Sequence, residues 1–356
     1  MRLTNILTVL SDFVMGRHTF GQIANTTKYV IITKIHKTPY VNWDPIALAV
    51  FPTYKCTMHC DMCLTHSTKF VNAYGQKPCK DMDILFFDKI LERYNNTLSI
   101  SILGNGEALL NKDFFKMVEH ASKKKMIIGA GSNGLLVGDY VNELLNSPID
   151  SFDISINGHD PSEFNRMTGM DPNLFNIVVE NSSRLIQRRD ASGNKKMKIL
   201  ASFILDRQNY KNLFEMIDLA DRIGFDKIRF FQFLATPVKG FNAEERSLFN
   251  DDLDVIEAFE RVKDLPNRIK AKVQLPPLIN RGIDNRNCDT WYRVLSIDGD
   301  GNVGGCSCQI LDLTISGKFS DINVWNNNFF QDMRRRFSND SDLPLLEPCK
   351  HCYNNL

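Results

Sequence analysis

The chain has 356 residues, with 43 Lys and Arg against 42 Asp and Glu, and its formal net charge of +1 excludes the basic field of proteins that coat nucleic acid. Hydrophobic residues make up 43% and charged residues 24%, as in globular chains that bury a core. At roughly 150 residues per domain, this length suits two or three domains or one α/β barrel with additions. No apolar run is long enough to cross a bilayer and the start lacks a secretion signal, which predicts a cytoplasmic protein.

Residues 1–44 are predicted to form an N-terminal helical segment, because apolar residues recur there at helical spacing, beginning with Leu3, Ile6, Leu7, Leu10, Phe13 and Val14. The segment holds five basic and two acidic residues. Two interpretations stay open. The segment covers a flank of the domain that follows, or it docks to a membrane surface through residues 1–20 or to a carrier-bound substrate.

From residue 46 onward, short apolar runs alternate with longer amphipathic stretches. The apolar runs predict strands at 46–51, 98–103, 126–130, 152–156, 199–205 and 227–233. The amphipathic stretches predict helices at 81–94, 112–124, 138–145, 173–188 and 210–223. This alternation is typical of parallel strands with covering helices, in an open sheet or a barrel.

The alternation stops near residue 270, and the rest of the chain is rich in Gly, Asn and Cys. The stretch from Asp298 to Val303 has the composition of a hairpin turn. We therefore expect three parts: the N-terminal segment 1–44, an α/β domain 45–270 and a small C-terminal domain 271–356.

Nine cysteines in a chain without an export signal are expected to stay reduced, so clusters of them indicate metal ligands or catalytic groups. Cys56, Cys60 and Cys63 follow the first predicted strand, at the strand end where active sites of such folds lie. Three thiolates leave one iron of a four-iron cluster open for another ligand. The alternative is a structural zinc site, which needs four ligands and would take His59 or His66 as the fourth.

The Cys-x3-Cys-x2-Cys spacing at this place resembles the radical S-adenosylmethionine (radical SAM) superfamily, and the resemblance runs from about Ile46 to the C-terminus. It implies a partial (β/α)6 TIM-like barrel with a small C-terminal cysteine-rich iron-sulfur domain. It also implies a 4Fe-4S cluster at the three cysteines, whose open iron binds S-adenosylmethionine and cleaves it to a 5′-deoxyadenosyl radical. The residue before the third cysteine is commonly aromatic in the family and is Met62 here.

Shorter motifs resemble cofactor-binding elements of that family. The loop with Gly104, Gly106 and Glu107 resembles its "GGEP" element, which binds the cofactor's amino group, with Ala108 in place of proline. Further positions are implied to contact its ribose or carboxylate, although turns and caps explain them equally well: Ser132, Asn133, Ser155 and Asn157. Arg166 offers bidentate pairing to a carboxylate.

A second group of cysteines lies near the C-terminus. Its spacing resembles the "twitch" form of SPASM-type domains, with Cys288, Gly301 and Cys306 followed by the pair Cys349 and Cys352. This resemblance implies a second 4Fe-4S cluster with four thiolate ligands. Four-cysteine zinc is the alternative. Cys308 is then a spare: a buried small residue, a hydrogen-atom donor or an alternative to Cys306. Cys79 stands alone.

The resemblance favours an oxidoreductase that oxidises a hydroxyl-bearing carbon of a sugar, aminocyclitol or similar intermediate, free or carrier-linked. This reaction implies an external electron donor such as flavodoxin or ferredoxin as a partner. Nucleic acid is not expected as a partner. Three other functions stay open: an epimerase with Cys308 or Cys79 as hydrogen donor, a maturase of ribosomal peptides, and a zinc-binding protein without enzymatic activity.

Overall fold

The computed structural model describes residues 16–35, 37–75, 80–193, 196–233, 243–263, 265, 269–279, 286, 288–306, 316–338, 341–346, 349 and 352. By its contacts the chain divides into two compact units. The first comprises residues 1–54, 79–129 and 286–345, and the second comprises residues 55–78, 130–285 and 346–356. Within the described residues, no helix has the length and apolar character needed to span a membrane.

The first unit is built on four strands in the order β2-β1-β8-β9. Strands β1 (Ala47–Phe51), β2 (Ser99–Ile102) and β8 (Val294–Asp298) run parallel, and Leu48 of β1 faces Ile100 and Leu295 of its neighbours. Strand β9 (Val303–Gly304) pairs with β8 in antiparallel fashion. The predicted hairpin is confirmed, because Gly301 takes a φ of 74° in a turn whose backbone N–H groups at Asp300 and Asn302 donate to the Asp298 carboxylate.

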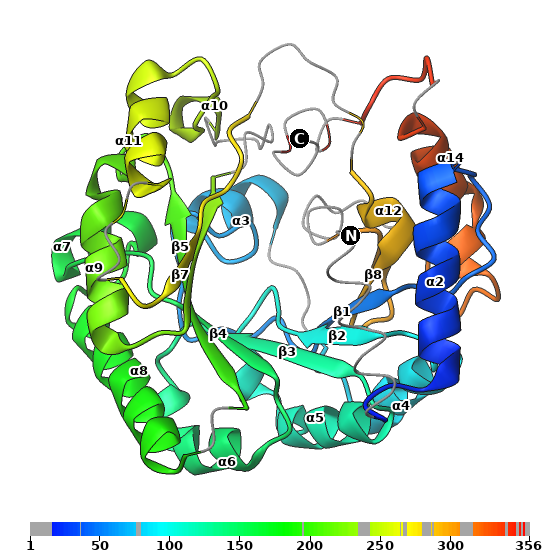
Figure 1. Ribbon diagram of the computed structural model, residues 1–356, viewed down its shortest axis with the longest axis horizontal. Helices are drawn as coiled ribbons and strands as arrows, with labels where there is room; N and C mark the ends of the chain where they lie inside the picture. The colour runs from blue at the N-terminus through cyan, green and yellow to red at the C-terminus, as the bar shows by residue number, and fades with distance from the viewer. Residues whose placement is uncertain are drawn as a thin grey trace. The chain divides into compact units, whose positions relative to one another are not determined.

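Helices α4 and α14 of the first unit begin with side-chain caps. Asp83 accepts from the backbone N–H of Phe86 at the start of α4, and Asn327 accepts from that of Phe330 at the start of α14. Helix α12 contacts both α2 and α14 (Figure 1). The bounds are α2 Phe20–Ile35, α4 Ile84–Arg93, η1 Ala108–Leu110, α5 Phe114–Lys123, α12 Thr290–Arg293, η4 Val324–Asn326 and α14 Asn328–Arg336.

The second unit holds four parallel strands in the order β4-β5-β6-β7. They are β4 (Ser151–Ser155), β5 (Lys198–Leu205), β6 (Lys227–Gln232) and β7 (Lys272–Gln274), and β3 (Ile127–Ser132) runs from the first unit into the second. The helices are α3 Thr68–Tyr74, η2 Val137–Tyr140, α6 Val141–Asn146, α7 Pro161–Thr168, α8 Asn173–Ala191, η3 Tyr210–Asn212, α9 Leu213–Ile223, α10 Ala243–Arg246 and α11 Leu253–Lys263.

Alternation along the strands of the second unit separates two faces of its sheet. One face carries Phe152, Phe203 and Phe230, which are fully buried, and Phe203 stacks on Phe230 with 5.3 Å between ring centroids. Helices α8 and α9 lie along this side of β4, β5 and β6 (Figure 1). We call the opposite side, which carries Asp153 and Arg229, the open face.

All six predicted strands are present, with ends that differ by one or two residues. Strand β8 was not predicted, and it comes from the region assigned to the C-terminal domain, yet it extends the parallel strands beside β1. The first predicted helical stretch lies in residues 1–15, outside the described part of the chain. The boundaries 1–44, 45–270 and 271–356 stay predictions.

Candidate active site

The three cysteines of the first group lie on one loop of the second unit. Cys56, Cys60 and Cys63 are all half-buried thiols. The loop turns where the backbone N–H of Cys63 donates to the Cys60 carbonyl at 2.9 Å. It ends at Ser67, whose hydroxyl accepts from the backbone N–H of Phe70 and caps α3. Local hydrogen bonds therefore hold the loop at the Cys60–Cys63 turn and at its C-terminal end.

Several N–H groups point at the cysteine sulfurs. The backbone N–H of Met58 lies 3.4 Å from Cys56 Sγ, and those of Thr65 and His66 lie 3.4 and 3.3 Å from Cys63 Sγ. The side-chain amide of Asn133 donates to Cys56 Sγ at 3.6 Å. Such donors stabilise thiolates, the form in which cysteine binds iron.

The pKa of Cys60 shows that the loop's thiolates need a positive charge to offset them. Burial, together with the charges at Cys63 and Cys56, raises the pKa of the Cys60 thiol to about 12. Three neighbouring thiolates are thus unfavourable unless a cationic centre offsets their charge. Three thiols, with N–H donors at the sulfurs of Cys56 and Cys63, fit the predicted four-iron cluster with one open iron.

Ser132 and Asn133 form the turn that the sequence predicted at the end of β3. Their side chains accept from the backbone N–H groups of Gly134 and Leu135 at 3.1 Å each. Gly134 has a φ of 87°, and a Cβ there would lie 2.7 Å from Val178. Asn133 also donates to Thr57 Oγ1 at 2.9 Å, so this turn supports the cysteine loop directly.

Two further predicted cofactor contacts lie at the end of β4. Ser155 is its last residue and faces Ser202 of β5. Asn157 takes a left-handed φ of 53°, and its Oδ1 accepts from the backbone N–H of Ile204 at 3.2 Å. That bond fixes the chain as it leaves β4. The contacts of both residues with the cofactor stay predictions.

Arg166 is paired within the chain. Its guanidinium donates to Glu163 Oε1 at 3.0 Å and to Gln208 at 3.1 Å. Glu163 is buried and also accepts from His159 Nδ1 at 2.6 Å and Asn212 at 2.8 Å. A cofactor carboxylate would share Arg166 with Glu163, so the predicted role of this arginine stays a prediction.

The glycine loop with Gly104, Gly106 and Glu107 belongs to the first unit. Glu107 is buried, and its carboxylate accepts from the backbone N–H of Leu109 at 3.2 Å to cap η1. A Cβ on Gly104 would lie 3.3 Å from the carbonyl of Thr53, so the backbone packs closely there. Binding of the cofactor's amino group by this loop stays a prediction.

The C-terminal cysteines are divided between the units. In the first unit, burial raises the pKa of Cys288, and the charge of Cys306 raises it further, so the two thiols are within electrostatic range. In the second unit, Cys349 and Cys352 share a turn in which the backbone N–H of Cys352 donates to the Cys349 carbonyl at 3.3 Å. Cys308 and Cys79 lie outside the described residues.

The turn that follows α7 was not predicted from the sequence. The backbone N–H of Asp61 donates to the Thr168 carbonyl at 3.0 Å, and that of His59 lies 3.4 Å from the sulfur of Met170. Met62 packs with Met167 and Phe233, in a cluster that Cys60 and Ile204 also contact. The pattern Asp160-Pro161 followed by Gly169 signals the helix, but no local pattern signals its contact with the cysteine loop.

Comparison with known proteins identifies a domain within the chain. Residues 50–189 match the model of the radical SAM superfamily. These residues form a radical SAM domain. A radical SAM domain implies a 4Fe-4S cluster and S-adenosylmethionine as cofactors, and the cysteine loop falls within the matched residues.

Curated relatives match part of the chain. A tungsten-containing aldehyde ferredoxin oxidoreductase cofactor-modifying protein of Pyrococcus furiosus is 26% identical over 178 residues, 49% of this chain and 48% of the relative. A probable GTP 3′,8-cyclase of Pyrobaculum aerophilum is 26% identical over 221 residues, 60% of this chain and 64% of the relative. The chain thus spans about half to two thirds of the length of these relatives.

Solved structures share the fold. Streptococcus suis SuiB bound to the precursor peptide SuiA superposes with a TM-score of 0.64 at 17% identity, covering 93% of this chain and 75% of SuiB. Native anSMEcpe with bound AdoMet gives 0.62 at 17% identity, covering 82% and 84%. These likenesses confirm the predicted α/β fold with a mostly parallel sheet.

Proposed function

We propose that this protein is a radical SAM enzyme that oxidises a hydroxyl-bearing carbon of a sugar, aminocyclitol or similar intermediate. The observation that carries the proposal is the cysteine loop, which gathers three half-buried thiols. Cys56 Sγ receives hydrogen bonds from the Met58 backbone and Asn133, and Cys63 Sγ receives them from the Thr65 and His66 backbone. Cys56, Cys60 and Cys63 would hold the cluster. When bound, the cluster and S-adenosylmethionine supply a 5′-deoxyadenosyl radical that takes a hydrogen atom from the substrate.

In this proposal, the chain's own residues hold the cysteine loop in position. Asn133 holds Cys56 through its sulfur, and the Thr168 carbonyl holds the backbone of Asp61 between the second and third cysteines. Met62 fixes the loop by packing on Met167 and Phe233, which is a side-chain role at the position where the family commonly has an aromatic residue. A fixed loop keeps the thiols in place for repeated turnover.

Oxidation of an alcohol carbon to a carbonyl removes one hydrogen atom, one proton and one electron from the substrate. The C-terminal cysteines support this choice, because Cys288, Cys306, Cys349 and Cys352 are four thiols suited to a closed second cluster that accepts the electron. We propose flavodoxin or ferredoxin as the donor that starts each turnover.

The first test is cleavage of the cofactor. Anaerobically reconstituted protein with dithionite should release 5′-deoxyadenosine from S-adenosylmethionine, and Cys56→Ala should abolish the release because one of three cluster ligands is lost. Cys288→Ala, which removes a thiol outside the loop, should retain most of it. Unchanged release by Cys56→Ala, measured by chromatography, would refute the radical SAM assignment of this loop.

The second test is the metal content. With two four-iron clusters, the anaerobic protein should contain about eight iron atoms per chain. The double variant Cys349→Ala/Cys352→Ala should lose about half of them and keep cofactor cleavage without substrate. Stoichiometric zinc in place of the second set of iron would support the structural zinc alternative.

Two other reactions compete with oxidation. Peptide modification is the second candidate, because similarly folded structures carry peptides, namely SuiB with SuiA and anSMEcpe with Cp18Cys. A short precursor peptide encoded beside this gene would favour it. Deuterium uptake from heavy water at unchanged oxidation level, lost in Cys308→Ala, would instead establish an epimerase.

A further inference from the structure

The open face of the second unit's sheet carries an unusual set of charges. Strand register places side chains of neighbouring strands in rows across the sheet. One row holds Asp153, Leu200, Lys227 and Lys272, and the next row toward the strand ends holds Ser155, Ser202, Arg229 and Gln274. We call Lys227, Arg229 and Lys272, together with Asp153, the basic face.

Positive charge exceeds negative charge on this basic face. Arg229 pairs with Asp153 at 3.3 Å, and Ser202 donates to the other oxygen of the same carboxylate. Burial lowers the pKa of Lys227, and repulsion from Arg229 and Lys272 lowers it further. Three cations and one carboxylate therefore share this face, and cations that repel each other attract an anion.

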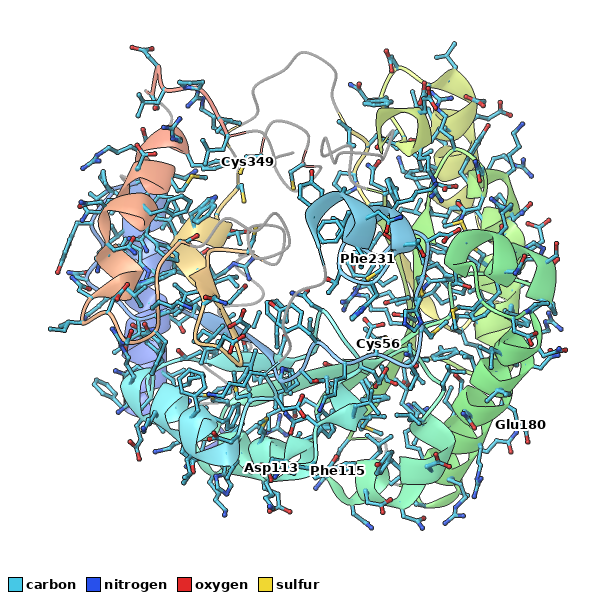
Figure 2. All side chains as sticks on the ribbon, turned by 180° about the vertical axis from the view of Figure 1, so that it is seen from behind. Cys56, Asp113, Phe115, Glu180, Phe231 and Cys349 are labelled. Atoms are coloured by element: carbon cyan, nitrogen blue, oxygen red, sulfur yellow. The ribbon has the colours of Figure 1, made fainter. Side chains whose placement is uncertain are left out.

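Packing does not require these charges. The apolar side of the same strands, with Phe203 and Phe230, already buries the core against the helices. Figure 2 shows Phe231 of β6 on the side of the sheet opposite α8, whereas Glu180 of α8 lies on the outer surface of its helix. Side chains of the basic face keep access to solvent, since Arg229 is 33% and Asp153 24% exposed.

Arg229 is held in one orientation. Its guanidinium lies 5.6 Å from the ring centroid of Phe231 on the same face, and Asp153 fixes one of its terminal nitrogens. A planar guanidinium that is already fixed loses little entropy when it binds an oxyanion, and it can present two parallel N–H groups to it.

The basic face also lies near the cysteine loop. Ile204 of β5 and Cys60 contact the same cluster of Met62, Met167 and Phe233. Ser202 is two residues before Ile204, which is about 7 Å along a strand. Ser202 and Arg229 face each other across β5 and β6, so the guanidinium is about one row of side chains from the loop.

We infer that the basic face binds an oxyanion of the substrate, a phosphate or carboxylate group held by Arg229 with Lys227 and Lys272. This inference rests on the proposed function, because the substrate carbon must reach the cysteine loop while its anion is anchored one or two rows below. It narrows the substrate class to anionic intermediates, such as a sugar phosphate or a sugar acid.

Binding of inorganic phosphate and of acetate to the full-length protein, followed by 31P and 1H NMR line broadening without S-adenosylmethionine, tests the inference. Wild type should bind one of the two saturably, and the tighter anion identifies the group. Arg229→Gln should weaken binding about tenfold, the value of one charge-assisted contact. The matched control is Arg222→Gln on α9, which removes an equal charge from an exposed ion pair with Asp218 and should change affinity less than twofold.

Should Arg229→Gln fail to fold, Lys272→Gln at an exposed position of β7 should weaken binding about threefold. Equal weakening by Arg222→Gln, or no saturable binding by wild type, would overturn the inference. Release of 5′-deoxyadenosine by the same wild-type preparation separates the two proposals: release without anion binding refutes only the basic face, and anion binding without release refutes only the proposed function.

Discussion

At the scale of single residues, Cys60 gives a measurable consequence of the loop's electrostatics. With the pKa of its thiol raised to about 12, Cys60 stays protonated at pH 8 in cluster-free protein, and its thiolate fraction rises with pH. Iodoacetamide should therefore label Cys60 on the order of a hundredfold more slowly than in urea-unfolded protein, after allowance for the greater nucleophilicity of a more basic thiolate. Peptide mass spectrometry at pH 8 and pH 9 measures this, and equal rates in folded and unfolded protein would contradict it.

The sequence predicts residues of the site only where their roles are local. Cys56, Cys60 and Cys63 lie within eight positions, so their spacing alone places three thiols on one loop. The hydrogen bond from Asn133 to Cys56 joins positions 77 apart, and no pattern in the sequence encodes it. Arg166 could be singled out as a cation, but its pairing with a buried Glu163 depends on Asn212 and other groups brought by the fold.

At the scale of elements, the turn after α7 is predicted to stabilise the cysteine loop. Gly169 ends this helix with a φ of 69°, and a Cβ there would lie 2.9 Å from the Asp61 carboxylate. Gly193, with a φ of 70° and no atom within 4 Å, is its matched control. Each change to alanine should cost about 1 kcal/mol in free energy of unfolding, because alanine is strained in left-handed backbone.

Only Gly169→Ala should loosen the cluster, because only there must Asp61 move, between two of the cysteines. Reconstituted Gly169→Ala should therefore lose iron to a chelator several times faster than wild type, while Gly193→Ala loses it at the wild-type rate. Iron release followed by absorbance checks this, and equal rates for the two variants would remove the proposed support.

Helices and strands could be predicted where their periodic patterns are local in the sequence. The pairing of one element with another could not. Strands β1 to β6 follow from their apolar runs, but the five-residue strand β8 gives too short a signal, and its partner β1 lies about 250 positions earlier. The predicted helix 138–145 is divided into η2 and α6. Asn181 of α8 packs against Gly138 and donates to the Gly134 and Leu135 carbonyls, a contact that comes from another helix.

At the largest scale, a buried guanidinium joins distant parts of the first unit. Arg334 of α14 is fully buried and donates to the carbonyls of Pro39, Trp291 and Trp325 at 3.1, 3.0 and 2.8 Å, and to Asn326 at 2.9 Å. It also lies 4.4 Å from the ring centroid of Trp325. Segments from both ends of the chain are thereby held by one side chain.

Replacement of Arg334 by methionine keeps much of its volume but leaves these four acceptors, three of them in buried hydrogen bonds, without their donor, so the unit should lose about 3 kcal/mol in free energy of unfolding. Arg335→Met, one position along on the exposed side of α14, should change it by less than about 0.5 kcal/mol. Urea unfolding followed by tryptophan fluorescence measures this unit directly, because all three tryptophans of the chain, Trp43, Trp291 and Trp325, lie within it. Equal stability of the two variants would show that the carbonyls find other donors once the guanidinium is gone.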